Sequence, residues 1–366
     1  MNDIIKQYDM NDAGTRREVF WLLKRLTSYT LWERKRDAWE IFTRAYEDAV
    51  KTWPKSQPEQ VEADNLPRIY GILSAYNKGL DELQKGYRFV WRIGQPLFEA
   101  KRESGVILTN FYRHPAYWER GMQLEPYPPR IEALNQLMLA SRYQGDQSPL
   151  EIDYASSHLG AYWSNPGNLL NPSAYNYGFY ELPYPVFPPL LPDVPVGTDI
   201  LIQSGQSVPV DGIWEPVKIH QDRLLGIIPL GGREVMNSGC FNYLVSETQA
   251  PRIAEYNEAT SRVEQVGTHW RLLWKDDRYK DGIVADESGY FLATDVGAQK
   301  PPKVNDVALE VRTGEECPVS GLWVAKDYEA APIQIAAGNV MPDLMVRSNL
   351  GEQTVHWVTW HLVKPD

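Results

Sequence analysis

Apolar residues in the first third of the chain recur at steps of three, four or seven, in one series over 19–53 and another over 69–97. This spacing places apolar side chains along one face of a helix. Thr15 followed by Glu18 is typical of a capping box, and Pro54 ends the first series. We therefore expect one long helix and a second helix that folds back on it as an antiparallel hairpin.

A shorter helix is predicted over residues 130–142, directly after Pro128–Pro129, because proline is tolerated in the first turn of a helix. The composition then changes. Nine of the 27 prolines fall between residues 149 and 195, among many tyrosines. Proline at that density excludes long helices, so we expect an ordered, extended connector there.

Beyond residue 196 the pattern becomes that of β-strands. Short β-branched and aromatic runs are separated by Asp-Gly, Gly-Gly and Ser-Gly turn signals. The runs are DILIQ, THWRLLW, GYFLAT, VALEVR and VHWVTWHLV. This part of the chain is predicted to be all-β.

One phrase occurs twice in the β region, as VPVDGIW at 208–214 and as CPVSGLW at 317–323. Its matched residues lie a constant 109 positions apart: Gly205 and Gly314, Pro209 and Pro318, Gly212 and Gly321, Trp214 and Trp323. Proline fixes φ, glycine permits positive φ, and the tryptophan can anchor the following strand. We interpret the phrase as a rigid turn at the corner of a small barrel-like unit, with both tryptophans buried.

Cys317 stands where the first copy of the phrase has Val208. Valine can be neither a nucleophile nor a metal ligand, whereas a buried free cysteine behaves as a small apolar residue. We therefore expect Cys317 to be a packing residue.

These patterns predict an α+β fold with segregated parts. An α-helical hairpin domain (1–148) precedes the connector (149–195) and an all-β region (196–366). The β region is expected to hold two related barrel-like repeat units, at about 198–245 and 307–363, with a hairpin insert between them.

Enzyme signatures are missing from the sequence. Its six histidines form no zinc-binding pattern, and there is no GxSxG, Walker loop or dinucleotide-binding fingerprint. We expect no catalytic residue, no metal and no cofactor. A Cys/His hydrolase assembled in space stays an open alternative.

The net charge of −11 is unevenly distributed. Residues 1–145 hold 22 Lys/Arg and 19 Asp/Glu, and the remainder holds 15 and 29. An acidic half argues against nucleic-acid binding and suits a basic protein partner. The chain has no apolar run long enough to cross a membrane and no signal-like start, so we expect a cytoplasmic protein without membrane insertion.

The densest acidic cluster has a spacing unlike that of a calcium loop. Its members are Asp276, Asp277, Asp281, Asp286 and Glu287. It is either a solvated turn or a contact patch for a basic protein. Under the second interpretation, changing Asp276, Asp277 and Asp281 to lysine would slow association without unfolding the protein.

A helical first part followed by the phrase TGE-x-CP-x-SG-x-W resembles bacterial immunity proteins of polymorphic-toxin and type VI secretion systems, in particular immunity protein 71/72. The second copy matches this phrase with Thr313, Gly314, Glu315, Cys317, Pro318, Ser320, Gly321 and Trp323. The resemblance lies mainly in the last 170 residues, and the helical part matches only in general character.

The resemblance implies a cytoplasmic protein that neutralises one cognate secreted toxin by occluding its active site, without catalysis. A basic toxin would meet the five acidic residues. The alternative is a glycan-binding or envelope-associated β module whose exposed Trp and Tyr side chains stack on sugars.

Overall fold

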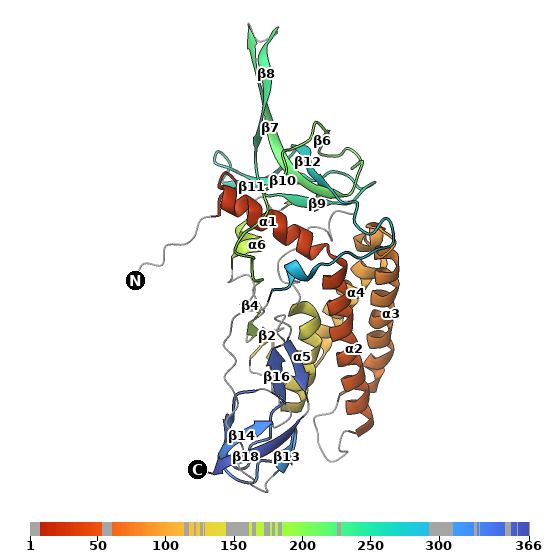
Figure 1. Cartoon of the computed structure of the whole chain (residues 1–366), viewed down its shortest axis with the longest axis vertical. Helices are drawn as coiled ribbons and strands as arrows, with labels where there is room; N and C mark the ends of the chain where they lie inside the picture. Colours follow the sequence, from red (N-terminus) through yellow and green to blue (C-terminus); the bar gives the residue numbers. More distant parts are fainter. Residues whose placement is uncertain are drawn as a thin grey trace, which may run out of the picture. The chain divides into compact units, whose positions relative to one another are not determined.

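The structure is a computed structural model (Figure 1). It describes residues 8–52, 61–112, 117–120, 122–124, 127, 129–143, 161–162, 166–171, 176–177, 180–181, 185–224, 228–292, 310–325, 328, 330–347, 353–356 and 358–365. About half of the predicted connector over 149–195 lies outside these residues.

Helices dominate the N-terminal part, and several small sheets follow. The α-helices are α1 (Ala13–Leu26), α2 (Tyr29–Thr52), α3 (Leu66–Leu83), α4 (Pro96–Asn110), α5 (Pro129–Tyr143) and α6 (Gly167–Leu170). Short 3-10 turns cover Ala63–Asn65, Phe89–Trp91 and Ser288–Tyr290. The α+β class and the helix predicted over 130–142 are confirmed.

The single long helix predicted over the first apolar series is wrong, because α1 and α2 are separate helices. The side chains of Thr27 and Ser28 explain the break. Thr27 Oγ1 donates to the carbonyl of Leu23, and Ser28 Oγ donates to that of Arg25. Such side-chain bonds compete with continuation of the helix.

The start of α1 also differs from the predicted capping box at Thr15. Asp12 is the N-cap, and its Oδ2 accepts the backbone N–H of Thr15 at 2.7 Å. The second apolar series is likewise interrupted. Helix α3 ends at Leu83, and Gly86 follows in the left-handed region with φ of 84°. Glycine takes this conformation at little cost, so it ends the helix.

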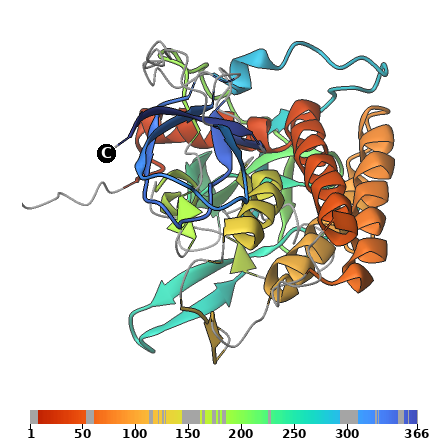
Figure 2. The ribbon, with the colours of Figure 1, turned by 90° about the horizontal axis from the view of Figure 1, so that it is seen from below.

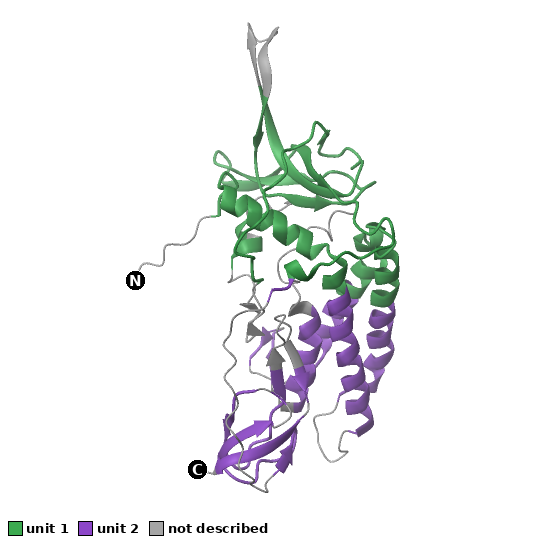
Figure 3. Cartoon of the chain, viewed as in Figure 1, with its two compact units in different colours: residues 1–32, 75–101, 145–290 green, residues 33–74, 102–144, 291–366 purple. Residues whose placement is uncertain are grey.

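The chain divides into two compact units, which Figure 3 colours separately. Unit 1 comprises residues 1–32, 75–101 and 145–290, and unit 2 comprises 33–74, 102–144 and 291–366. In Figures 1 and 2, α2 and α3 lie side by side. Within unit 2, Trp39 Nε1 donates to the carbonyl of Ile69 at 3.0 Å, joining these two helices. The domain boundaries that we expect from the sequence stay a prediction.

The β-strands before residue 196 are short: β1 (Trp118–Glu119), β2 (Met122–Gln123), β3 (Ala161–Tyr162), β4 (Asn176–Tyr177) and β5 (Tyr180–Glu181). Unit 1 continues with β6 (Leu201–Gln203), β7 (Gly212–Leu224), β8 (Ile228–Asn237), β9 (Asn242–Leu244), β10 (Arg252–Asn257), β11 (Arg262–Val266) and β12 (His269–Lys275). Unit 2 holds β13 (Glu310–Arg312), β14 (Gly321–Ala325), β15 (Ile333–Ile335), β16 (Leu344–Arg347), β17 (Gln353–His356) and β18 (Thr359–Pro365).

The strand predictions hold in part. DILIQ contains β6, THWRLLW contains β12, and VHWVTWHLV spans the end of β17 and most of β18. GYFLAT is different, because its first two residues belong to the 3-10 turn at Ser288–Tyr290 and its last two lie outside the described residues.

The two copies of the repeated phrase belong to sheets with the same connectivity. Strands β6, β12, β7 and β9 pair in that order in unit 1, as do β13, β18, β14 and β15 in unit 2. The hairpins β10–β11 and β16–β17 occupy the same place in the two sequences. Strand pairing in the first copy therefore continues to β12, beyond residue 245, and β8 is an addition to that copy.

The two copies share a left-handed glycine just before the corner phrase and a backbone hydrogen bond at its first residue. Gly205 and Gly314 have φ of 89° and 84°. The N–H groups of Val208 and Cys317 donate to the carbonyls of Thr248 and Asn339 at 2.8 and 2.7 Å, respectively. Pro209 and Pro318 are exposed at these corners. The prediction of an architectural turn agrees with this geometry.

Each copy has its own apolar core. The first contains Ile202, Val208, Trp214, Leu244, Ala250, Ile253, Trp270 and Leu272. The second contains Val311, Cys317, Trp323, Ala325, Ile335, Met341, Leu344, Val358, Trp360 and Leu362. The predicted burial of Trp214 and Trp323 is confirmed, since both are fully buried.

The glycine that precedes each buried tryptophan begins a strand beside its neighbours. A Cβ on Gly212 would lie 2.1 Å from the carbonyl oxygen of Trp274, so a side chain is excluded there by backbone. Gly321 pairs with Ile335 and Pro365 in the second copy. Among the described residues the strands form open sheets without a closed barrel, so the barrel-like form of the units is not confirmed.

Replacing Cys317 with valine is expected to change the free energy of unfolding by less than about 1.5 kcal/mol, because valine fills the equivalent buried position, Val208, in the first copy. Cys317 is buried, and its Sγ lies 3.2 Å from the carbonyl of Val319. Chemical denaturation of Cys317→Val, beside the reciprocal Val208→Cys, measures this change. A loss of function in a stably folded Cys317→Val protein would instead assign the thiol a chemical role.

Candidate protein-binding surface

The acidic segment, residues 276–290 of unit 1, contains all five acidic residues singled out in the sequence. The structure divides them into two groups. Asp276 and Glu287 are buried, whereas Asp277, Asp281 and Asp286 are exposed. The two groups therefore differ in what they can contact.

Asp276 lies at the centre of a buried ion cluster. Its Oδ1 accepts a hydrogen bond from Arg88 Nη2 at 3.0 Å, and its Oδ2 accepts from Arg278 Nη2 at 2.8 Å. The hydroxyl of Tyr243 donates to Oδ2 at 2.7 Å. Burial by itself would raise the pKa of Asp276, but the two guanidinium groups and these hydrogen bonds hold it below its ordinary value.

Arg278 ties this cluster to the end of α1. Its Nη1 donates to the carbonyl of Lys24 at 3.0 Å, and its Nη2 donates to the carbonyl of Thr27 at 3.2 Å. The last carbonyls of a helix have no partner within the helix, so a guanidinium is well suited to this position.

Glu287 accepts a hydrogen bond from the backbone at the start of α2. Its Oε2 accepts the backbone N–H of Thr30 at 2.8 Å, and its Oε1 accepts the hydroxyl of Tyr279. A carboxylate is stabilised near the N-terminus of a helix. Asp276 and Glu287 thus hold the acidic segment against the junction between α1 and α2, and they are not available to a partner protein.

The charge reversal that we expected to leave the fold intact therefore needs correction. A lysine at position 276 would be buried beside Arg88 and Arg278, where a third positive charge is strongly destabilising. The sequence carried one signal of this burial: Asp276 follows directly on the apolar run that forms β12.

The three exposed carboxylates remain as contact candidates. Asp277 forms ion pairs with Lys275 at 3.0 Å and with Lys280 at 2.5 Å. Asp281 and Asp286 each accept a backbone N–H two residues further along, from Ile283 and Ser288. These two carboxylates are bound by neutral backbone groups, which leave their negative charge in place, so both can attract a cationic surface.

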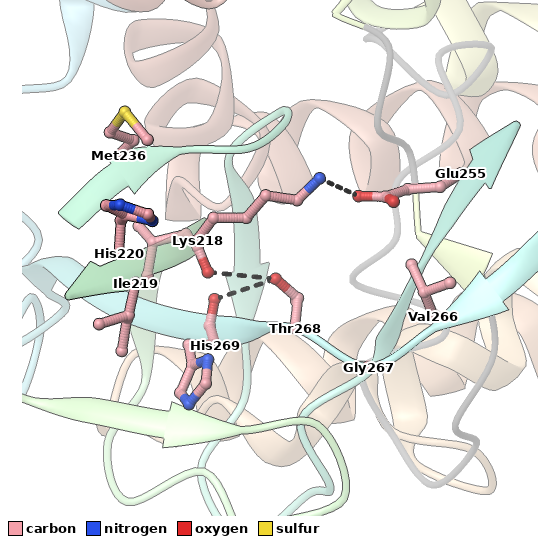
Figure 4. A pocket seen from close by; sticks show the side chains of 10 residues that line it. Lys218, Ile219, His220, Met236, Glu255, Val266, Gly267, Thr268 and His269 are labelled. Carbon is pink, nitrogen blue, oxygen red and sulfur yellow. Dashed lines mark hydrogen bonds and ion pairs between the residues drawn. The ribbon is translucent and has the colours of Figure 1, made fainter. Parts of the chain in front are cut away.

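A second feature of unit 1 is an open hollow of about 470 Å³ beside β7, shown in Figure 4. It is lined by Val217, Lys218, Ile219, His220, Met236, Glu255, Val266, Gly267, Thr268 and His269. Lys218 Nζ and Glu255 Oε1 lie 3.0 Å apart across it. Thr268 Oγ1 lies 3.4 Å from the carbonyl oxygen of Val217. We call this site the β7 hollow.

The lining of the β7 hollow contains both charged and apolar side chains. Its lining combines the Lys218–Glu255 ion pair with apolar side chains, and His269 Nε2 lies 3.0 Å from Gln203 Nε2. Among the described residues, no group of three His, Cys, Asp or Glu side chains could hold a metal ion. Nor does any described helix have the length and apolarity needed to cross a membrane.

Comparison with known protein families gives two matches. The model of the family named immunity protein 71 matches residues 10–147, and that of immunity protein 72 matches residues 193–292. This chain is an immunity protein of the polymorphic-toxin type. No curated protein and no solved structure matches it. The immunity protein 71 match covers α1 to α5, and the immunity protein 72 match covers the first β copy and the acidic segment.

The distribution of these matches corrects one expectation. We placed the resemblance mainly in the last 170 residues, yet the helical part of this immunity protein carries a family match of its own. The second copy, with Cys317 and Trp323, lies outside both matches. The phrase that suggested the family is thus an architectural element shared by the two copies.

Proposed function

We propose that this immunity protein binds one cognate secreted toxin and blocks its active site, in the cytoplasm and without catalysis of its own. The pair of family matches, one on the helices and one on the first β copy, is the observation that carries the proposal. Delivery of the toxin by a type VI secretion system is part of the same proposal.

The burial of the repeated tryptophans removes two side chains that a sugar-binding surface could have used. Trp214 and Trp323 lie inside their cores with no exposed face. These two side chains therefore cannot stack on a glycan, as the alternative function would require of exposed Trp and Tyr side chains.

A pull-down from producing cells tests this function. Tagged immunity protein is expected to recover one toxin domain at a one-to-one ratio, and purified immunity protein is expected to inhibit that domain at equimolar concentration. Recovery of a glycan or an envelope protein in its place would favour the alternative function.

We further propose that Asp277, Asp281 and Asp286 steer a basic toxin towards unit 1. Changing all three to lysine is expected to slow association about tenfold at low ionic strength, since steering by exposed charges acts on the on-rate and is screened by salt. The fold should be retained, because all three side chains are exposed. Stopped-flow association at two salt concentrations measures the effect.

The matched control reverses three exposed carboxylates elsewhere in unit 1, Asp81, Asp193 and Glu258. It changes the net charge by the same amount. Equal on-rates for the two triple variants would assign the effect to net charge and remove the acidic segment from the interface.

A further inference from the structure

Strand β7 is longer than the strand that pairs with one of its edges. Strand β12 pairs with β7 only as far as Val217, opposite His269, whereas β7 continues to Leu224. On its other edge β7 pairs with β9 and then with β8. The part of β7 after Val217 therefore belongs to a two-stranded ribbon, visible in Figure 1.

The direction of the backbone groups on this ribbon follows from one bond. The carbonyl of Pro216 accepts the N–H of Ser238 at 2.9 Å, so the polar backbone groups of residue 216 face β8. Successive residues of an antiparallel strand alternate in this respect. The backbone N–H and carbonyl groups of Lys218 and His220 therefore also face β8, opposite Met236 and Glu234. The backbone N–H and carbonyl of Ile219 face the other edge of β7, beyond the point where its pairing with β12 ends. We call this part of β7 the free edge.

The free edge opens into the β7 hollow. Gly267 and Thr268 precede β12 and form part of the lining of the hollow beside β7. Thr268 Oγ1 lies near the carbonyl of Val217, which is the last β7 residue paired with β12. In the described part of the chain no strand pairs with β7 at Ile219 on this side. The hollow thus provides room next to an N–H and a carbonyl that are set out for strand pairing.

We propose that an extended segment of the toxin adds to this edge of β7 as an extra strand, in line with β12 and starting at Ile219. An unpaired edge is a template for pairing with another chain, and strand addition is a common mode of peptide recognition. This proposal rests on the proposed function, because it names how the toxin is bound.

A second copy of the same chain is a less suitable occupant. The chain carries a net charge of −11, so two copies repel each other. The lining of the hollow also contains apolar side chains, among them Ile219 and Val266, together with the Lys218–Glu255 ion pair. An extended segment that carries both apolar and polar side chains suits this mixed lining.

Two residues that face each other in the ribbon allow a test variant and a matched control. Ile219 and Val235 lie opposite each other in β7 and β8, and the alternation directs the N–H of each away from the other strand. Proline removes that N–H and is tolerated at the edge of a sheet. Ile219→Pro therefore removes a donor from the edge beside the hollow, and Val235→Pro removes one from the opposite edge.

Binding is measured by titrating each variant with the purified, catalytically inactivated toxin domain recovered in the pull-down. Ile219→Pro is expected to raise the Kd about tenfold or more, and Val235→Pro is expected to leave it within about twofold. Thermal melting verifies that both variants fold. Equal affinities of Ile219→Pro and the wild type would overturn the strand-addition proposal and leave the proposed function standing. A wild-type protein that fails to bind would contradict both.

Hydrogen exchange of the wild-type protein gives a readout that does not depend on either variant. The Ile219 amide is expected to exchange rapidly in the free protein and to become protected in the complex with the toxin domain. An Ile219 amide that exchanges equally fast in the free protein and the complex overturns the proposal. So does protection of this amide by self-association of the free protein at high concentration, because it assigns the edge to a second copy.

Discussion

Replacing Asp276 with alanine is expected to lower the free energy of unfolding by about 3–5 kcal/mol, the range measured when one partner of a buried ion pair is removed. The side chains of Asp276 and Arg88 are both fully buried, and Arg278 is largely so. The alanine variant would leave two guanidinium groups without their carboxylate. Chemical denaturation followed by tryptophan fluorescence measures the loss.

The neighbouring residue provides the control. Asp277 is exposed and pairs with two lysines, so Asp277→Ala is expected to change the free energy of unfolding by no more than about 1 kcal/mol. Similar losses for the two variants would contradict the assignment of Asp276 as the buried centre of the cluster.

The pH dependence of the wild type has a defined sign. The folded-state pKa of Asp276 is lowered, so its contribution is fully present above the unfolded pKa of 3.8 and is lost as the pH falls through the folded pKa. The difference in stability between wild type and Asp276→Ala should therefore shrink only in acid below about pH 4.

Truncating Trp214 or Trp323 to alanine is expected to cost about 3–5 kcal/mol each, as for other large buried aromatics. Each fills the core of its own copy, and in both residues the buried indole Nε1 has no hydrogen-bond partner among the described groups. The loss therefore comes from packing. Trp214 belongs to unit 1 and Trp323 to unit 2, so denaturation curves of the two variants report on both.

An exposed aromatic residue is the control for this pair. Tyr256, on β10, has 63% of its surface exposed, and Tyr256→Ala is expected to stay within about 0.5 kcal/mol of the wild type. Losses below about 1 kcal/mol at both tryptophans would contradict their role as the anchors of the two cores.

The sequence was informative wherever a local pattern decides the structure. The proline pair before residue 130 located α5, the repeated phrase located both corners, and Trp214 and Trp323 were correctly expected to be buried. The break between α1 and α2 was missed, because it depends on the hydroxyls of Thr27 and Ser28, which fit a helix as well as a helix end.

The acidic segment shows more clearly what could not be predicted from the sequence. Five carboxylates close together in sequence looked equivalent, but the fold buries Asp276 and Glu287 and exposes the other three. The residues that decide this, Arg88 and Thr30, lie about 190 and 260 positions away along the chain. Local spacing carries no information about partners at that distance, so only the three-dimensional structure separates structural acids from available ones.

The free edge of β7 was also hidden in the sequence. The repeated phrase predicted that β7 and β14 would be equivalent strands. They are equivalent where β7 pairs with β12 and where β14 pairs with β18. The extra length of β7 and the added strand β8 distinguish the first copy. The immunity protein 72 match covers this first copy and ends at residue 292, before the second copy begins.

Growth of cells that express the toxin domain recovered in the pull-down tests directly whether this protein neutralises that toxin. Co-expression of the wild-type immunity protein is expected to restore growth, and a complex of the two should then be purified in a one-to-one ratio. Ile219→Pro, if stably folded, should protect less well than Val235→Pro. Full toxicity in the presence of abundant, folded wild-type protein would show that it does not neutralise this toxin.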